Sequence, residues 1–262
     1  MIKAAFFDVD GTLLSHATHC VPKSARESLE KLRSKGIKTY LCTGRHMLEF
    51  DFLPMADIPF DGYITLNGHL CLDANKQLLC DFPFPEDTVR ALIARFKEHH
   101  LPLLLVEENG MTLNFVNDTV IRAQKAISSP IPNIAPYDGK PIYLATAYVT
   151  PDEDDLIRSI IPSNCHIARW NDRGIDLILN DVGKVAGIRT IPAAVVRPVT
   201  LPPFLKIIPA PRKPTPLTTC AARRAGSAPR VPLYISFDAE VRSAKPYLET
   251  IMIRAAPAHT IM

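Results

Sequence analysis

Long apolar runs and paired cysteine spacings are both missing from this sequence of 262 residues. No apolar run approaches the roughly 20 residues that a membrane-spanning helix needs. The apolar stretch at residues 4–7 is stopped by Asp8 and is too short for a signal peptide. The six cysteines form no C-x-x-C pair and no zinc-type spacing. These absences argue against a membrane protein and a zinc module, and we expect reduced thiols in a cytoplasmic protein.

Glycine and acidic residues are scarce in the last quarter of the chain. Residues 188–262 hold one of the 11 glycines and three of the 27 acidic residues, but 12 of the 24 prolines and 11 of the 30 lysines and arginines. The net charge is therefore +8 over this segment and −5 over residues 1–187. The whole chain, with 47% hydrophobic and 22% charged residues, has the composition of a soluble globular protein. The two parts nevertheless differ in folding pattern, so we interpret them separately.

The first part of the chain alternates between strand and helix patterns. A short apolar run at residues 2–7 is typical of a buried parallel strand. Residues 23–36 carry apolar side chains at helical spacing and end on a glycine, which predicts a helix. Further strands are predicted at residues 37–42 and 62–66. This order predicts a right-handed βαβ unit with a parallel sheet.

A different pattern begins near residue 82, where hairpins alternate with helices. Helices are predicted around residues 89–96, at residues 118–127 and after a capping box at residues 150–153, and strands at 103–106, 111–116, 142–149, 166–170 and 175–179. Residues 128–136 are expected to form a loop. The pattern favours an α+β insert with an antiparallel sheet.

Two carboxylates follow the first predicted strand. Asp8 and Asp10 are two residues apart at its carboxyl end, the edge of an open α/β sheet where ligands bind. Two neighbouring acids repel each other unless a cation or a proton lies between them, and Mg²⁺ prefers oxygen ligands of this kind. Asp8 could also attack a phosphorus atom while Asp10 transfers the proton. Gly11 permits the tight turn that follows. The alternative is a turn without chemistry, but the full string of hydrophobic residue, D-x-D-G-T and hydrophobic residue favours a site.

Four segments together resemble one known family. Phe-Asp-Val-Asp-Gly-Thr-Leu at residues 7–13 resembles the first motif of the haloacid dehalogenase (HAD) superfamily of phosphotransferases. Leu-Cys-Thr-Gly-Arg at residues 41–45 resembles its second motif. Asp-Gly-Tyr-Ile-Thr-Leu-Asn-Gly at residues 61–68 is similar to a segment of Cof-type members, and Gly-Lys-Val-Ala-Gly at residues 183–187 to the third motif. The resemblance covers residues 1 to about 191.

The resemblance implies a fold, a domain organisation and an activity. The expected fold is α/β, with a Rossmann-like parallel-sheet core and an inserted α+β cap domain. Residues 1–81 and 183–262 would form the core, with 188–262 atypical, and residues 82–182 the cap that selects the substrate. The expected activity is that of a Mg²⁺-dependent phosphatase that acts on small phosphorylated metabolites, with sugar phosphates favoured, through an aspartyl-phosphate intermediate.

The resemblance also assigns roles to single residues. Asp8 would be the nucleophile, Asp10 the acid and base, and both would hold Mg²⁺. The residues expected to bind phosphate are Gly11, Thr43, Gly44 and Lys184, and those expected to contact the substrate are Arg45 and Asn67. Taken singly, Thr43 could instead cap a helix and Lys184 could be a solvated surface lysine. The histidines have no partner spacing, and we expect them on the surface.

The resemblance ends after the third motif, near residue 191. The fourth motif of the family, an acidic cluster of the type G-D-x-x-x-D that completes the metal site, is not found there. The helix predicted from Val185 meets Pro192, which a helix interior tolerates poorly. A reading-frame shift near residue 191 and genuine divergence both explain this tail. A weak surrogate is the strand pattern at residues 233–237, followed by Asp238, but it lacks the glycine.

Three functions are therefore considered. The first is the phosphatase, and the second is a HAD-fold protein with impaired catalysis because its metal site is incomplete. The third is a basic arm for nucleic acid, which the tail charge of +8 permits but which no aromatic-basic pattern or known module supports. We rank it last and expect a small phosphorylated substrate as the partner, with no membrane partner. The sequence carries no signal for the oligomeric state.

Overall fold

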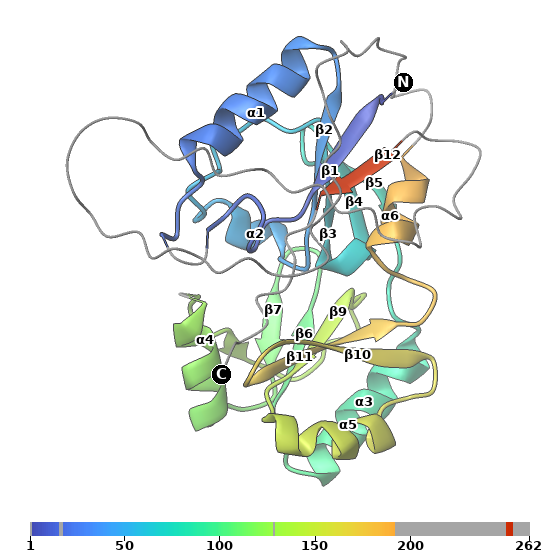
Figure 1. Cartoon of the computed structure of the whole chain (residues 1–262). Helices are drawn as coiled ribbons and strands as arrows, with labels where there is room; N and C mark the ends of the chain where they lie inside the picture. Colours follow the sequence, from blue (N-terminus) through green and yellow to red (C-terminus); the bar gives the residue numbers. More distant parts are fainter. Residues whose placement is uncertain (1, 16–17, 128, 192–249, 254–262) are drawn as a thin grey trace, which may run out of the picture. The chain divides into compact units, whose positions relative to one another are not determined.

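The computed structural model describes residues 2–15, 18–127, 129–191 and 250–253 of the chain (Figure 1). The chain divides into two compact units. The first comprises residues 1–41, 57–61 and 192–262, and the second comprises residues 42–56 and 62–191. The division into a core and a cap at residues 82 and 182 stays a prediction, and each unit is described by itself.

The first unit contains parallel strands and a helix, as the sequence predicts. Its elements are β1 (Ala4–Phe7), α1 (Lys23–Ser34), β2 (Lys38–Cys42) and β12 (Thr250–Ile253). β1 is fully buried and pairs in parallel with β2 on one side and β12 on the other (Figure 1). The Phe6 and Tyr40 rings are directly opposite in this register and stack with centroids 4.9 Å apart. The predicted α/β architecture with parallel strands is thus confirmed.

A glycine ends α1 at the predicted place. Gly36 has φ 71°, in the left-handed region where glycine is not strained, and its N–H donates to the Arg33 carbonyl oxygen at 2.8 Å. The Ile37 N–H donates to the Leu32 carbonyl oxygen at 3.1 Å, which closes the last turn. The buried residues of α1, Ala25 and Leu29, lie one turn apart on a single face. The chain therefore reverses here and enters β2.

The smaller group of strands in the second unit contains a hairpin that the sequence interpretation missed. Its elements are β3 (Gly62–Thr65), the 3₁₀ helix η1 (Leu66–Gly68), β4 (Leu70–Asp73) and β5 (Leu78–Asp81), and the strands are antiparallel in the order β3-β4-β5. Asp73 Oδ1 accepts the Asn75 and Gln77 N–H groups and so closes the turn. Leu78 and Leu79 of β5 are adjacent and both partly exposed, so the strand lacks the alternation that reveals a half-buried strand.

The larger sheet of the second unit confirms both predicted hairpins. Its strand order is β10-β11-β9-β6-β7-β8, formed by β6 (Leu103–Val106), β7 (Met111–Leu113), β8 (Asn133–Ile134), β9 (Leu144–Ala147), β10 (Cys165–Asn171) and β11 (Gly174–Leu179). The β6–β7 and β10–β11 pairs are antiparallel, as expected. The expected loop at residues 128–136 instead contributes β8, which pairs in parallel with β7.

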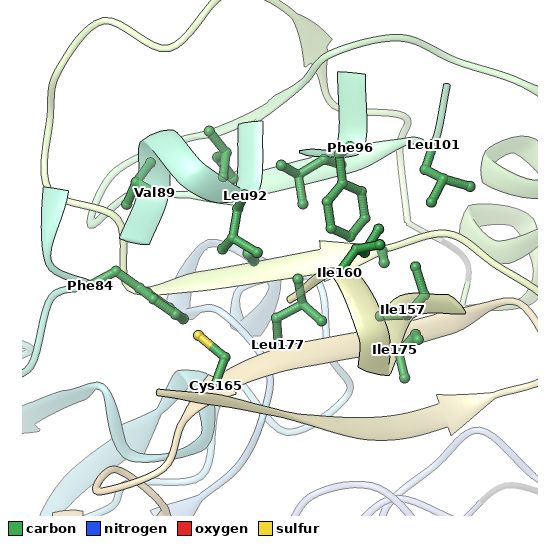
Figure 2. Close-up of a cluster of buried hydrophobic side chains, with 14 of the residues drawn as sticks. Phe84, Val89, Leu92, Phe96, Leu101, Ile157, Ile160, Cys165, Ile175 and Leu177 are labelled. Carbon is green, nitrogen blue, oxygen red and sulfur yellow. The ribbon is translucent and has the colours of Figure 1, made fainter. Parts of the chain in front are cut away.

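Helices pack on both faces of this sheet. They are α3 (Glu86–Glu98), α4 (Asp118–Ala126) and α5 (Asp154–Ile160), and the 3₁₀ helix η2 (Pro151–Glu153) directly precedes α5. Leu103 and Leu105 of β6 share a buried cluster with α3 and α5. Figure 2 shows part of this cluster, including Phe96 of α3 and Ile157 of α5. Leu104 and Val106 share a second cluster with α4 and with Leu66 of η1. Successive residues of β6 thus serve opposite faces, as the period of a strand requires. No helix within the described ranges is long and apolar enough to span a membrane.

Two histidines are buried, contrary to the expectation that histidines lie on the surface. His46 is 2% exposed and His69 0%. His69 donates from Nδ1 to the Phe82 carbonyl oxygen at 2.7 Å, and its ring stacks on Phe84 with centroids 5.2 Å apart. Its Nε2 has no hydrogen-bond partner among the residues described. Burial lowers the pKa of His69 to about 4. The sequence interpretation was wrong here because tertiary contacts bury these rings.

We expect the buried His69 to make the protein less stable as the pH falls. The unfolded chain binds a proton at this ring below a pKa of about 6.5, whereas the folded chain does so only below about 4. Since the unfolded state then holds more protons, the free energy of unfolding should fall between about pH 6.5 and about pH 4. Urea unfolding across this range checks it. His69→Asn, which can still donate to a carbonyl, should flatten the dependence relative to His99→Asn on the surface, and an unchanged slope would contradict the assignment.

Candidate functional site

The predicted nucleophile lies directly after a buried strand of the first unit. Asp8 follows β1, and its Oδ1 accepts the Val9 N–H at 2.9 Å. Val9 is fully buried, so the strand continues as an anchored segment beyond Asp8. The side chain of Asp8 therefore starts from a fixed backbone at the carboxyl end of a parallel strand, where ligands bind in sheets of this type.

The turn after Asp8 is closed on the carbonyl oxygen of Val9. This oxygen accepts the N–H groups of Thr12, Leu13 and Leu14 at 3.2, 3.0 and 2.8 Å. Gly11 has φ 72°, which a residue with a Cβ adopts only with strain, and its N–H donates to the Leu14 carbonyl oxygen at 2.9 Å. Asp10 forms an isolated bridge with Leu14. The turn therefore keeps Asp8, Asp10 and Gly11 close together in the first unit.

The second unit contains the turn that was expected to bind phosphate. Thr43 is 3% exposed, and its N–H donates to the Ile64 carbonyl oxygen at 2.8 Å. Its Oγ1 accepts the Arg45 N–H at 3.1 Å, which tightens the turn formed by residues 43–45. The alternative role of Thr43 as a helix cap is wrong, because the N-cap of α2 (Met47–Phe50) is His46.

His46 connects this turn to the hairpin between β6 and β7. Its Nδ1 accepts the Leu48 N–H at 3.0 Å, so the proton is on Nε2, which donates to the Glu107 carbonyl oxygen at 2.9 Å. Its own N–H donates to Glu49 at 3.0 Å and completes a capping box. Burial lowers the pKa of His46. The neutral ring is the form that both hydrogen bonds need.

Asn67 is packed against the same turn. It has φ 54° and ψ 27°, a left-handed conformation that asparagine tolerates better than most residues. Its N–H donates to the Thr43 carbonyl oxygen at 3.0 Å. A methyl group added at Gly44 would lie 3.0 Å from Oδ1 of Asn67, so the absence of a side chain at Gly44 permits this contact. The structure thus brings together Asn67 and the turn at residues 43–45.

A carboxylate that the sequence interpretation missed adjoins Asn67. The carboxylate of Asp176 on β11 accepts two hydrogen bonds. Oδ2 accepts from Asn67 Nδ2 at 3.0 Å, and Oδ1 accepts from Thr146 Oγ1 at 2.9 Å. Burial raises the pKa of Asp176 to about 7, although the hydrogen bonds from Thr146 and Asn67 act in the opposite direction. The signal in the sequence was an acid within the otherwise apolar segment Ile175–Leu179. Such a position predicts a partnered carboxylate rather than a solvated one.

Lys184 is the first residue of α6 (Lys184–Thr190) and is partly buried. The start of α6 is packed against η1, because a methyl group added at Gly68 would lie 2.2 Å from the Gly183 carbonyl oxygen. α6 ends at Thr190, two residues before Pro192. This end is expected, because the residue before a proline disfavours the helical conformation. Lys184 therefore starts from a backbone that contacts the segment next to Asn67.

The described residues contain no group of three or more His, Cys, Asp and Glu side chains placed to hold a metal ion. Asp8 and Asp10 supply two acids close in sequence, and their oxygens are of the type that Mg²⁺ prefers. The surrogate acid considered for the fourth motif, Asp238, lies outside the residues that the structure describes. The oxygen donors in the described part of the chain are thus of the type that Mg²⁺ binds, but they supply few protein ligands.

Comparison with known proteins gives one consistent family. Residues 5–195 match the model of the haloacid dehalogenase-like hydrolase family. A Bacillus subtilis (strain 168) protein named "Putative phosphatase YkrA" is 24% identical over 193 residues, which cover 72% of this chain and 73% of that protein.

Solved structures agree with this match. BT1666 from Bacteroides thetaiotaomicron, described among phosphatases of the haloalkanoate (HAD) enzyme superfamily, is 26% identical with a TM-score of 0.65, over 72% of this chain and 71% of that one. BT4131, described as a HAD subclass IIB sugar phosphatase, is 29% identical with a TM-score of 0.63, over 72% and 74% of the two chains. All the residues proposed for the site lie within the matched segment, whereas residues 196–262 lie beyond it.

We expect Gly68→Ala to destabilise the second unit. Gly68 has φ 102°, and the added methyl group would meet the Gly183 backbone at 2.2 Å, so strain and collision act together. The loss should exceed about 1 kcal/mol in the free energy of unfolding. Gly183→Ala is the matched control, because nothing lies within 4 Å of its added methyl group. Equal effects of the two substitutions in chemical denaturation would contradict the packing of η1 on α6.

Proposed function

We propose, from the premise that this chain belongs to the haloacid dehalogenase-like hydrolase family, that it is a Mg²⁺-dependent phosphatase of the Cof type. Its substrates would be small phosphorylated metabolites, sugar phosphates among them. The family match and the phosphatase names of its relatives support phosphoric ester hydrolysis. The observation that carries the proposal is the pair Asp8 and Asp10, held at the end of buried β1 by a turn closed on the Val9 carbonyl oxygen.

The proposed reaction has two displacements at phosphorus. In the first, a carboxylate oxygen of Asp8 forms a bond to phosphorus while the bond to the ester oxygen breaks, and Asp10 gives that oxygen a proton. In the second, water gives its proton to Asp10 and attacks phosphorus, which releases inorganic phosphate and restores the Asp8 carboxylate. Each proton that leaves Asp10 is thus returned within one turnover.

Other residues would bind the phosphoryl oxygens. The Thr43 hydroxyl and the Lys184 ammonium group are the proposed side-chain ligands, with Gly11 and Gly44 allowing close approach of the backbone. Mg²⁺, when bound, would offset the charge between phosphate and carboxylate, and the Asp8 side chain and the Asp10 main-chain carbonyl oxygen would hold it. Arg45 and Asn67 would contact the rest of the substrate, and residues 82–182 would act as the substrate-selecting cap.

A second candidate is a relative with impaired catalysis. It is favoured by the absence of a three-residue metal group from the described ranges and by the end of the family match at residue 195. With few protein ligands, Mg²⁺ keeps several waters and is held weakly. The two candidates share the same fold and differ in turnover, so kinetic measurements separate them.

We predict that Asp8→Asn lowers turnover of a general phosphate ester by at least about 10³-fold, since an amide oxygen does not form the acyl phosphate. Steady-state hydrolysis at saturating Mg²⁺ measures this loss. Asp51→Asn is the matched control, because Asp51 pairs at 2.9 Å with Lys76 on the surface. Turnover of Asp8→Asn close to that of the control would remove Asp8 from the reaction.

We also predict weak Mg²⁺ binding, so that turnover keeps rising through a Mg²⁺ titration and stays far below that of an intact relative. The physical reason is the small number of protein ligands to the ion. The titration is run on the full chain and on Asp238→Ala. Strong activity that collapses in Asp238→Ala would instead identify Asp238 as a metal ligand, and strong activity that survives there would require a different acid.

A further inference from the structure

One carboxylate joins the larger sheet of the second unit to the segment beside the proposed phosphate-binding turn. Asp176 on β11 lies directly opposite Thr146 on β9 in the antiparallel register, and the Thr146 hydroxyl donates to Oδ1 at 2.9 Å. Its second oxygen, Oδ2, accepts Asn67 Nδ2 at 3.0 Å. Thr146 is 4% exposed, so the carboxylate is held from the sheet side by a buried donor. The two oxygens of Asp176 thus have separate partners on separate elements.

The position of Asn67 determines that of the turn at residues 43–45. The Asn67 N–H donates to the Thr43 carbonyl oxygen, and the neighbouring Leu66 N–H donates to the Arg45 carbonyl oxygen, at 3.0 and 3.3 Å. The Asn67 side chain also fills the space above Gly44, where an added methyl group would lie 3.2 Å from Nδ2. A different rotamer of Asn67 would therefore vacate this contact and loosen the turn.

We propose that Asp176 is a positioning residue for the phosphate-binding turn, which it orients through the Asn67 side chain. The proposal rests on the proposed phosphatase function, because it assigns the turn at residues 43–45 to the phosphoryl group. A carboxylate repels a phosphate dianion, so Asp176 acts through a neutral amide rather than by contact with the substrate. Thr146 supports Asp176 in turn.

Several groups around Asp176 influence its ionisation. Glu49 of α2 raises its pKa, whereas the Trp170 indole on β10 acts with Thr146 and Asn67 to lower it. Tyr148 directly follows β9. Burial and the charges of Asp176 and Glu49 raise its pKa. The Arg45 guanidinium group lies 4.0 Å from the Glu49 carboxylate and partly offsets its charge. The balance raises the pKa of Asp176 to about 7, mainly because of burial.

Protonation of Asp176 should leave the Asn67 contact in place. The proton can reside on Oδ1 and be donated to the Thr146 hydroxyl oxygen, while Oδ2 continues to accept from Asn67. Asp176→Asn reproduces this neutral arrangement at every pH, because its amide nitrogen can face Thr146. Asp176→Leu removes the acceptor and leaves Asn67 Nδ2 without its partner. The two variants therefore separate the hydrogen bond from the charge.

The first test is kinetic. Asp176→Leu should raise KM and lower kcat/KM for a general phosphate ester by between about tenfold and about 100-fold, as misplacement of a binding group does. Asp176→Asn should stay within a few-fold of the parent at every pH, because it keeps an acceptor for Asn67 Nδ2. Asp81→Leu is the control, because Asp81 lies on β5 and its carboxylate accepts a hydrogen bond from the Tyr143 hydroxyl at 2.9 Å. Parent-like kcat/KM in Asp176→Leu would overturn the proposal.

The second test does not need catalysis. In Asp8→Asn, the side-chain amide resonances of Asn67 should shift with a midpoint near pH 7, and the added substitution Asp176→Asn should abolish that shift. Inorganic phosphate, followed by the backbone amide resonances of Thr43 and Gly44, should bind at least about tenfold more weakly when Asp176 is leucine. Flat Asn67 resonances or unchanged phosphate affinity would overturn the proposal.

The outcomes distinguish this proposal from the proposed function. Loss of activity in Asp8→Asn with unchanged kinetics in both Asp176 variants leaves the phosphatase intact and removes Asp176 from a positioning role. Absence of hydrolysis in every form of the chain removes the phosphatase, and the phosphate titration then decides whether Asp176 orients the turn. If Asp176→Leu does not fold, as its amide spectrum would show, the pH titration of the Asn67 resonances and its loss in Asp176→Asn give the decision.

Discussion

The second unit depends on the close contacts that η1 makes with the start of α6 and with the turn at residues 43–45. Gly68 has φ 102° and approaches the Gly183 carbonyl oxygen so closely that a methyl group has no room. Asn67, one residue earlier, is also left-handed and covers Gly44. Consecutive left-handed residues are costly unless their surroundings hold them. Here hydrogen bonds to the Thr43 turn and to Asp176 hold them, so the strained segment is also the one to which the proposed ligand-binding residues are attached.

The electrostatic character of this region follows from the same packing. Burial favours neutral forms, which lowers the pKa values of His46 and His69 and raises that of Asp176. His46 and Asp176 have partners for both of their polar side-chain atoms, whereas His69, among the residues described, has one at Nδ1 only. A buried polar atom without a partner is costly, so these hydrogen bonds offset the cost of burial. The interior around the turn is therefore polar but close to neutral. Under the proposed function, a phosphate at this turn would be bound mainly by hydrogen-bond donors, with Lys184 supplying a positive charge.

The parts of the site that could be predicted are those encoded locally. The Asp8 turn is specified by residues within six positions of one another, because β1 is apolar and Gly11 supplies the left-handed conformation. Asp176 could not be predicted in the same way, since its partner Asn67 is 109 residues away along the chain. The β4–β5 hairpin was missed because the exposed leucines of β5 break the alternation. His69 has no local pattern that predicts burial, and its stacking on Phe84 is a tertiary contact.

The tail shows that completing a sheet and completing a metal site are separate requirements. β1 is buried, so its backbone N–H and C=O groups need partners on both sides. β2 supplies one side, and β12 supplies the other through the register that pairs Ala4 with Thr250 and Phe7 with Ile253. Backbone pairing of this kind makes little demand on side-chain identity, so four residues beyond the matched segment can satisfy it. Coordination of Mg²⁺ instead requires carboxylate oxygens at defined positions, and a segment with three acids in 75 residues offers few of them. A basic, proline-rich tail can therefore support the strand that presents Asp8 without restoring the acids that would hold the ion beside it.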